Sequence, residues 1–199
     1  MAFLCCCCPG GSSSDRHLEL VDEDSGSAIA LSARAAGTSV SITSSGSVLS
    51  GSGAALASTP IEQDAAYWEI KVLTDGGTVG VGVARELSAK ELEKGLASGV
   101  TKGPENAKQR SWALLSGKVN LSQGDVIGVA FGQNDLPNLR FTLNDAPLEH
   151  LSVNRIRGLV YPAAYVDGGA EIELIFSGRD FAHTPPQTFS PLMAAQSIL

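Results

Sequence analysis

The chain has 199 residues, enough for one well-packed domain with short tails. Its apolar fraction of 43% is typical of a globular protein and excludes a disordered one. The formal charge of −7 argues against a nucleic-acid partner, because contact with a phosphate backbone needs clustered Lys and Arg. With 22 glycines and only 6% aromatic residues, we expect many tight turns and few long helices.

The cysteines occupy one short segment at the N-terminus, directly after Phe3 and Leu4. All four are consecutive: Cys5, Cys6, Cys7 and Cys8. Adjacent side chains diverge, which suits neither a disulfide framework nor a tetrahedral metal site. The crowded, apolar-flanked thiols suit S-acylation instead, which would hold the domain at the cytoplasmic face of a membrane. One acyl chain binds only transiently, so stable attachment needs at least two; an unmodified, redox-exposed tail is the alternative.

Composition divides the chain into three parts. Residues 1–16 are predicted to be a flexible cysteine-rich tail, residues 17–190 one domain, and residues 191–199 a short C-terminal tail. No apolar run approaches the roughly 20 residues that span a bilayer. Residues 1–8 are too short for the apolar core of a signal peptide, and no Lys or Arg precedes them. The cytoplasm is therefore the expected compartment.

From about residue 28 the pattern is one of short strands and turns. The clearest strand is residues 67–73, which alternate between apolar and polar side chains. Asp75-Gly76-Gly77 then predicts a tight hairpin into a strand over residues 78–84. In that strand, Gly80 and Gly82 are expected to leave space for a bulky side chain, Trp68 or Trp112. Further strands are expected over residues 40–42, 112–114, 126–131, 139–143, 159–165 and 172–176.

Only one helix interrupts this series. Residues 88–91 form a capping box, and Leu87, Leu92 and Leu96 continue at near-helical spacing until Gly95 and Gly99 end the segment. A parallel α/β fold would need a helix after most strands. The pattern therefore predicts an all-β fold, an antiparallel sandwich or barrel with one short helix.

The sequence offers little to a catalytic or metal site. The three histidines, His17, His150 and His183, have no cysteine or second histidine at metal-ligand spacing. No Gly-x-Ser-x-Gly elbow nominates a nucleophile. We therefore predict a protein that is not an enzyme and has no metal and no cofactor.

Five segments, in this order, resemble a SPRY domain: YWEIKV (67–72), VGVGVA (79–84), GDVIGV (124–129), FTLN (141–144) and LVYPAA (159–164). The resemblance covers roughly residues 28–180. The segments 53–60, 156–158, 165–167 and 183–186, with the cysteine-rich start, resemble one subgroup of that family. The resemblance implies a B30.2-like β-sandwich of two antiparallel sheets, without catalytic residues, that acts in protein–protein recognition.

SPRY relatives that bind peptides use loops at one end of the sandwich, so an unknown protein or peptide is the expected partner. The resemblance assigns these loops to Ser44, Ser45, Gly46 and Ser47, to Leu115 and Ser116, and to Val166, Asp167, Gly168 and Gly169. They contain no aromatic or Arg anchor of the kind that dominates binding energy. A face around Arg155, Arg157 and Tyr161 is the alternative contact surface.

Two other functions remain open at this level. A lectin-like binder of glycans or small molecules shares the sandwich architecture, and a calcium-bridged sugar site would use Gln133, Asn134 and Asp135. A hydrolase would need a Ser/His/Asp group that converges in a deep cleft.

Overall fold

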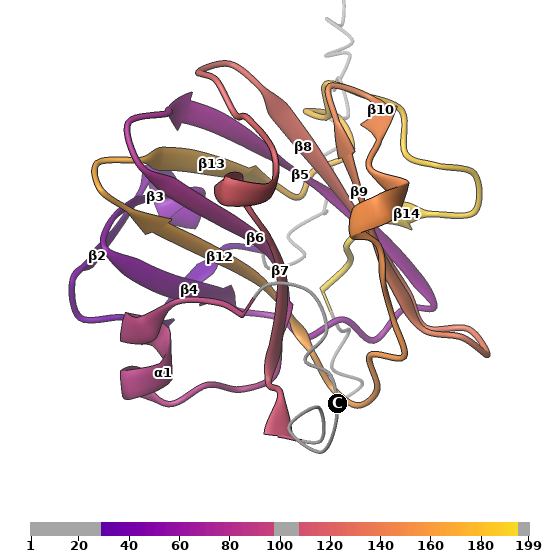
Figure 1. Cartoon of the computed structure of the whole chain (residues 1–199). Coiled ribbons are helices and arrows are strands. Elements are labelled where there is room, and N and C mark those ends of the chain that lie inside the picture. Colours follow the sequence, from indigo (N-terminus) through magenta and orange to yellow (C-terminus); the bar gives the residue numbers. More distant parts are fainter. Residues whose placement is uncertain (1–28, 98–107, 195–199) are drawn as a thin grey trace, which may run out of the picture.

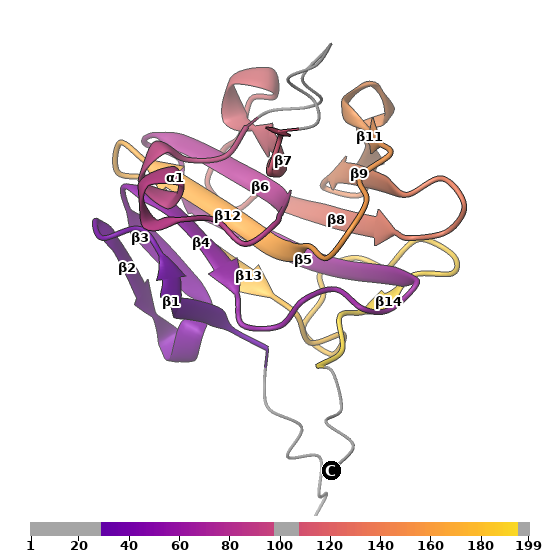
Figure 2. The same cartoon turned by 90° about the horizontal axis from the view of Figure 1, so that it is seen from below.

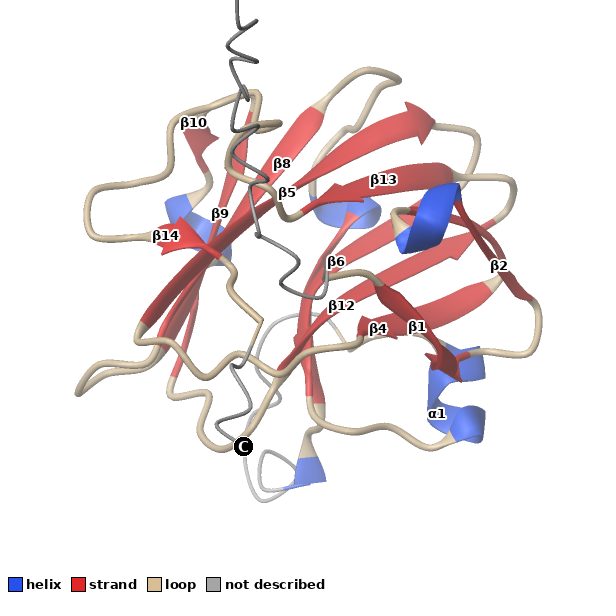
Figure 3. Ribbon diagram, turned by 180° about the vertical axis from the view of Figure 1, so that it is seen from behind, coloured by secondary structure: helices blue, strands red, loops and turns tan. Residues whose placement is uncertain are grey.

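In the part of the chain that the structure describes, two sheets, one short α-helix and short 3-10 helices make up the regular structure, so the predicted all-β antiparallel sandwich is confirmed (Figures 1 and 3). The computed structural model describes residues 29–97 and 108–194. The predicted lipidation sites, Cys5 to Cys8, lie outside the described residues.

The first sheet has five strands and is antiparallel throughout. Its central strand is β12 (Tyr161–Asp167), which pairs along its whole length with β6 and on its other side with β4. The order across the sheet is β1 (Leu31–Ala36), β4 (Gly53–Ala57), β12, β6 (Thr78–Ala84) and β7 (Ser111–Leu115).

The second sheet is built around β5 (Ala65–Thr74), the longest strand. The order is β10 (Ala146–Pro147), β9 (Asn138–Leu143), β8 (Val126–Gly132), β5, β13 (Glu171–Ile175), β3 (Val48–Gly51) and β2 (Val40–Thr43). Two short strands pair beside this path: β11 (Val153–Asn154) with β9, and β14 (Ser190–Pro191) with β5. The β14 pairing is parallel.

The main core lies between the two sheets. From β5, Ala66, Trp68 and Ile70 point into it, and from β6 Val81 and Val83 do so. All five are at most 1% exposed. Because side chains alternate along a strand, this face of β5 is the apolar half of the pattern seen in the sequence.

A second apolar cluster covers the outer face of the five-stranded sheet. There α1 (Ala89–Lys94) lies against β4 and β1 (Figure 2), and Leu92 and Leu96 pack on the sheet. The predicted capping box is present, with the Ser88 backbone N–H donating to Glu91 Oε2 at 2.8 Å. Burying Leu92 contributes about 1.5–3 kcal/mol, which fixes a helix too short to be stable alone.

The glycines of β6 have a different neighbour from the one expected. A Cβ on Gly80 would lie 2.7 Å from Leu115 Cδ2 and 3.2 Å from Tyr165 Cβ, so these side chains, not Trp68 or Trp112, pack over it. At Gly82 the close neighbour is the backbone carbonyl of Trp112. The expectation of close packing was right, but the identity of the residues was wrong because it depends on the strand order.

Part of the outer face of β5 is also buried, at the polar residues Tyr67 and Glu69. Glu69 is fully buried, and its carboxylate accepts hydrogen bonds from the backbone N–H groups of Ala182 at 2.6 Å and His183 at 2.9 Å. It also accepts the Tyr67 hydroxyl at 3.0 Å, and the Tyr67 ring meets Phe181 edge-on at 5.1 Å. The segment after β13 is thus fastened over the nine-stranded sheet by one carboxylate.

The segment after β13 continues to pack on the domain beyond residue 190. The backbone N–H of Leu192 donates to the carbonyl of Tyr67 at 3.2 Å, and the Leu192 side chain is buried in the main core. Burial raises the pKa of Tyr67 above its ordinary range, and the neighbouring Glu69 carboxylate raises it further. The Tyr67 hydroxyl therefore remains a hydrogen-bond donor at neutral pH.

Replacing Glu69 by Gln is expected to lower the free energy of unfolding by about 2–4 kcal/mol, because the amide group cannot accept all three hydrogen bonds. Tyr67→Phe removes one of them and should cost about 1 kcal/mol. The exposed Glu62→Gln serves as the matched control and should change stability by less than about 0.5 kcal/mol. Urea unfolding measures all three, and equal values for Glu69→Gln and Glu62→Gln would contradict a structural role for the carboxylate.

Candidate functional site

The strands run between two ends of the sandwich, which differ in their connections. We call one the loop end; it comprises residues 37–39, 51–52, 75–77, 116–125, 144–145 and 167–169. We call the other the tail end, because the described chain begins there at Ile29. It comprises residues 29–30, 58–64, 85–87, 108–110, 133–137 and 155–160.

Besides the longer β7–β8 connection, four short connections at the loop end carry the chain from one sheet to the other. They join β1 to β2, β3 to β4, β5 to β6, and β12 to β13, each with only one to three residues between the strands. Packed sheets lie about 10 Å apart, so such short crossings leave the backbone little freedom. We therefore expect the backbone of these four crossings to be rigid.

The four crossings also contact one another. The backbone N–H of Ser52 donates to the carbonyl of Ser39 at 3.0 Å, and the Ser52 hydroxyl donates to Asp167 Oδ1 at 2.8 Å. Any Cβ on Gly77 would lie 1.9 Å from the carbonyl oxygen of Asp167, so this approach requires glycine. Asp167 thus joins three of the crossings into one unit.

Six of the predicted binding-loop residues meet at this end. Val166, Asp167, Gly168 and Gly169 form the turn between β12 and β13, and Leu115 and Ser116 end β7 beside them. The Ser116 hydroxyl accepts the backbone N–H of Val79 at 3.1 Å, and Leu115 is half-buried. Val166 is fully buried, so the turn between β12 and β13 presents Asp167, Gly168 and Gly169 to a partner.

The other four predicted residues lie elsewhere. Ser44, Ser45, Gly46 and Ser47 form the tip of the β2–β3 hairpin, at its opposite end from Gly51. Gly46 packs against Ala30, and the Ser47 carbonyl accepts the backbone N–H of Leu174 at 2.8 Å. The structure therefore does not bring this tip together with the other two predicted loops.

Acidic side chains dominate the loop end. Two lysines, Lys71 and Lys118, lie at or beside these connections. The five carboxylates there are Asp75, Asp125, Asp145, Asp167 and Glu171. Several of them order the backbone. Asp125 accepts the Ser122 N–H at 2.7 Å and the Asn144 side-chain amide at 2.8 Å, and Asp75 accepts the Gln123 N–H at 3.2 Å.

Tyr165 lies next to this charge, on the outer face of β12. Burial raises the pKa of the Tyr165 hydroxyl, and the negative charge of Asp167 raises it further. Sequence reasoning missed Ser52 and Asp125 as members of this end. The signal for Asp75 was present, since Asp75-Gly76-Gly77 marks a turn, but nothing in the sequence places that turn beside Asp167.

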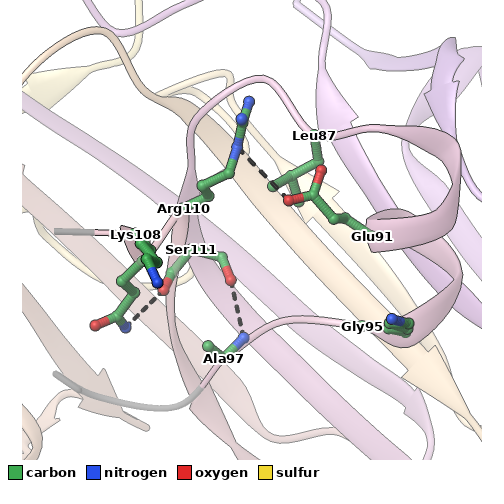
Figure 4. A pocket seen from close by; sticks show the side chains of 9 residues that line it. Leu87, Glu91, Gly95, Ala97, Lys108, Arg110 and Ser111 are labelled. Atoms are coloured by element: carbon green, nitrogen blue, oxygen red, sulfur yellow. Dashed lines mark hydrogen bonds and ion pairs between the residues drawn. The ribbon is translucent and has the colours of Figure 1, made fainter. Parts of the chain in front are cut away.

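A hollow of about 340 Å³ lies beside α1 (Figure 4). Its polar walls are linked to each other: Arg110 Nε lies 3.7 Å from Glu91 Oε1, and the Ser111 hydroxyl accepts the Ala97 N–H at 2.9 Å. Hydrogen bonds from Ser88 lower the pKa of Glu91 below its ordinary value. These interactions brace the helix against β7, which accounts for the residues that line the hollow.

Two of the other candidate residues, His183 and Gln133, have structural partners. His183 Nδ1 lies 3.5 Å from the buried Glu69 carboxylate, and the Gln133 side-chain amide donates to the carbonyls of Ile61 at 2.9 Å and Gln63 at 3.1 Å. Over residues 29–97 and 108–194, no three His, Cys, Asp or Glu side chains are grouped so as to hold a metal ion. Nor is any helix in these two ranges long and apolar enough to cross a bilayer.

The alternative surface predicted around Arg155, Arg157 and Tyr161 lies at or near the tail end. There the Arg85 guanidinium donates to the carbonyl of Arg157 at 3.0 Å and lies 5.5 Å from the centre of the Trp112 ring. Arg155 and Arg157 are exposed, whereas Tyr161 is half-buried.

Comparison with known proteins agrees with the sequence resemblance. No protein-family model matches the chain. SPRY domain-containing protein 7 of Mus musculus and that of Homo sapiens are each 32% identical over 178 residues, which is 86% of this chain and 86% of theirs. The Gallus gallus protein of the same name is 32% identical over 176 residues.

Among solved structures, one titled "Stonustoxin structure" matches with a TM-score of 0.47 and 13% identity. The match covers 74% of this chain and 27% of that one. The identity to the curated relatives, sustained over 86% of both chains, confirms the resemblance seen in the sequence. The chain belongs to the SPRY domain family, as a relative of SPRY domain-containing protein 7.

Proposed function

We propose that the chain is a non-enzymatic interaction module that binds a polypeptide segment at its loop end and is attached to a membrane through acylated Cys5, Cys6, Cys7 and Cys8. Membership of the SPRY family supports a protein-interaction module in general. The observation that carries the finer proposal is the set of crossings tied together by Asp167.

A rigid loop surface suits binding. Association is weakened by the entropy of ordering loops, and a surface whose loops are already fixed avoids most of that cost. Gly168 and Gly169 are exposed at its centre, so a partner's backbone can approach closely. The surrounding carboxylates favour a segment that carries Lys or Arg, chiefly by raising the association rate and the specificity.

The polar groups of the chain support binding better than catalysis. The buried carboxylate Glu69 accepts three hydrogen bonds that hold the segment after β13, and the Ser116 hydroxyl accepts a backbone N–H. A catalytic base or nucleophile must instead be within reach of a substrate. We therefore assign these groups a structural role.

The membrane attachment is argued from the cysteine run alone. Four adjacent thiols next to Phe3 and Leu4 provide more than the two acyl chains that stable anchoring needs. Attachment to a membrane would concentrate the bound partner at that surface, which raises its effective concentration there.

Changing Cys5–Cys8 to serine should move the full-length protein from the membrane pellet to the soluble fraction of expressing cells, because all acylation sites are lost. Hydroxylamine, which cleaves thioesters, should release the wild-type protein in the same way. A membrane fraction that neither treatment changes would rule out the acyl tether.

Reversing charge at the loop end with Asp75→Lys and Glu171→Lys should reduce labelling of the partner by about fivefold or more, because a basic segment would then be repelled. Quantitative proximity labelling with the full-length chain measures this. The matched control, Glu62→Lys and Asp135→Lys, makes the same charge change at the tail end and should retain the partner. Equal loss in both pairs, with unchanged melting temperatures, would place the binding site elsewhere.

A further inference from the structure

The large exposed apolar side chains of the described residues lie at the tail end. In the described parts of the chain, three large hydrophobic residues are exposed: Leu136 (53%), Leu159 (54%) and Met193 (63%). Leu136 is in the β8–β9 connection and Leu159 precedes Val160, whose carbonyl accepts the backbone N–H of Ile61. The Met193 backbone N–H donates to Gln63 Oε1 at 2.8 Å, so all three lie at one end.

The charge at this end differs from that at the loop end. Four arginines are mixed with the apolar residues, at the connections that precede β7 and β12 and follow β6: Arg85, Arg110, Arg155 and Arg157. Lys108 adds a fifth positive charge, and four carboxylates at the same end nearly balance the five: Glu62, Asp64, Glu86 and Asp135. The tail end is thus close to neutral and partly apolar, whereas the loop end carries an excess of negative charge.

The cysteine-bearing tail joins the domain at this same end. The carbonyl of Ala30, the second described residue, accepts the backbone N–H of Ser58 at 2.8 Å, and Leu31 pairs with Ala57. Roughly 20 residues separate Cys8 from Ile29, which limits the covalent reach to about 70 Å. A domain of this length has a radius of gyration of about 15 Å, so the tether alone does not select an orientation. The surface composition must do so.

We propose that the tail end lies against an anionic lipid bilayer, with Leu136, Leu159 and Met193 entering the interface and the arginines at the level of the headgroups. The inference rests on the proposed membrane attachment and adds the orientation of the domain on the bilayer. Exposed apolar side chains flanked by Arg match a headgroup–acyl boundary, where both find a partner. Lipid phosphates and anionic headgroups attract arginine and repel the acidic loop end, so both charge patterns favour one orientation.

The test uses the full-length chain coupled through its N-terminal cysteines to maleimide-headgroup lipid in vesicles of phosphatidylcholine and phosphatidylserine. This chemical tether makes the result independent of natural acylation. Leu159→Trp adds a reporter at the tail end, and Gln123→Trp adds one at an exposed position of the loop end. Both variants keep the buried Trp68 and Trp112 as a common background. Brominated phosphatidylcholine should quench the Trp added at position 159 and leave that at position 123 unchanged.

Equal quenching at the two positions, or quenching at neither, would overturn the inference; the latter is also the result expected if the apolar residues bind a protein. A second arm replaces Leu136, Leu159 and Met193 by glutamate in the cysteine-to-serine chain. Affinity for the same vesicles should fall by about tenfold or more. The control variant adds the same charge at the loop end, and its affinity for the vesicles should fall less. It combines Ser39→Glu, Asn120→Glu and Gln123→Glu. If the acyl tether fails in cells, these vesicle results still decide the orientation.

Discussion

The constraint on which the structure depends is that four connections of one to three residues join two stacked sheets at the same end. Crossings this short require small residues and close backbone contact, as at Gly77 and the Asp167 carbonyl. They also require local hydrogen bonds, which Ser52 and Asp167 supply. The small residues of the crossings and their rigidity are consequences of this one feature.

The second organising interaction is the buried carboxylate of Glu69. An uncompensated charge in this position would destabilise the fold by several kcal/mol, so the segment that brings two backbone N–H groups to it is fixed in place. That segment packs on the outer face of the nine-stranded sheet at Tyr67 and Glu69, as α1 packs on part of the outer face of the other sheet. The connections between strands are gathered at the two ends of the sandwich, where the proposed contacts with other molecules would form.

The sequence predicted β5, whose side chains alternate between polar and apolar, and also β6 and β8, which are short runs of apolar residues and glycine. It did not predict β4, whose residues Gly53–Ala57 are mostly small and buried throughout. Within the candidate site, the loops after β7 and β12 were found together, but Ser44–Gly46 was not near them. The hairpin tip points to the other end because β3 pairs antiparallel with β13, and pairing between distant strands cannot be read from local sequence.

The two ends are separated by the length of the strands, and this separation makes their proposed roles compatible. A seven-residue strand such as β12 spans about 23 Å, nearly three times the Debye length of about 8 Å at physiological salt. Carboxylates at the loop end would then be screened from anionic headgroups at the tail end. Acidic loops can therefore attract a basic segment without weakening attachment to the bilayer, and the partner would be held at a fixed height above the membrane.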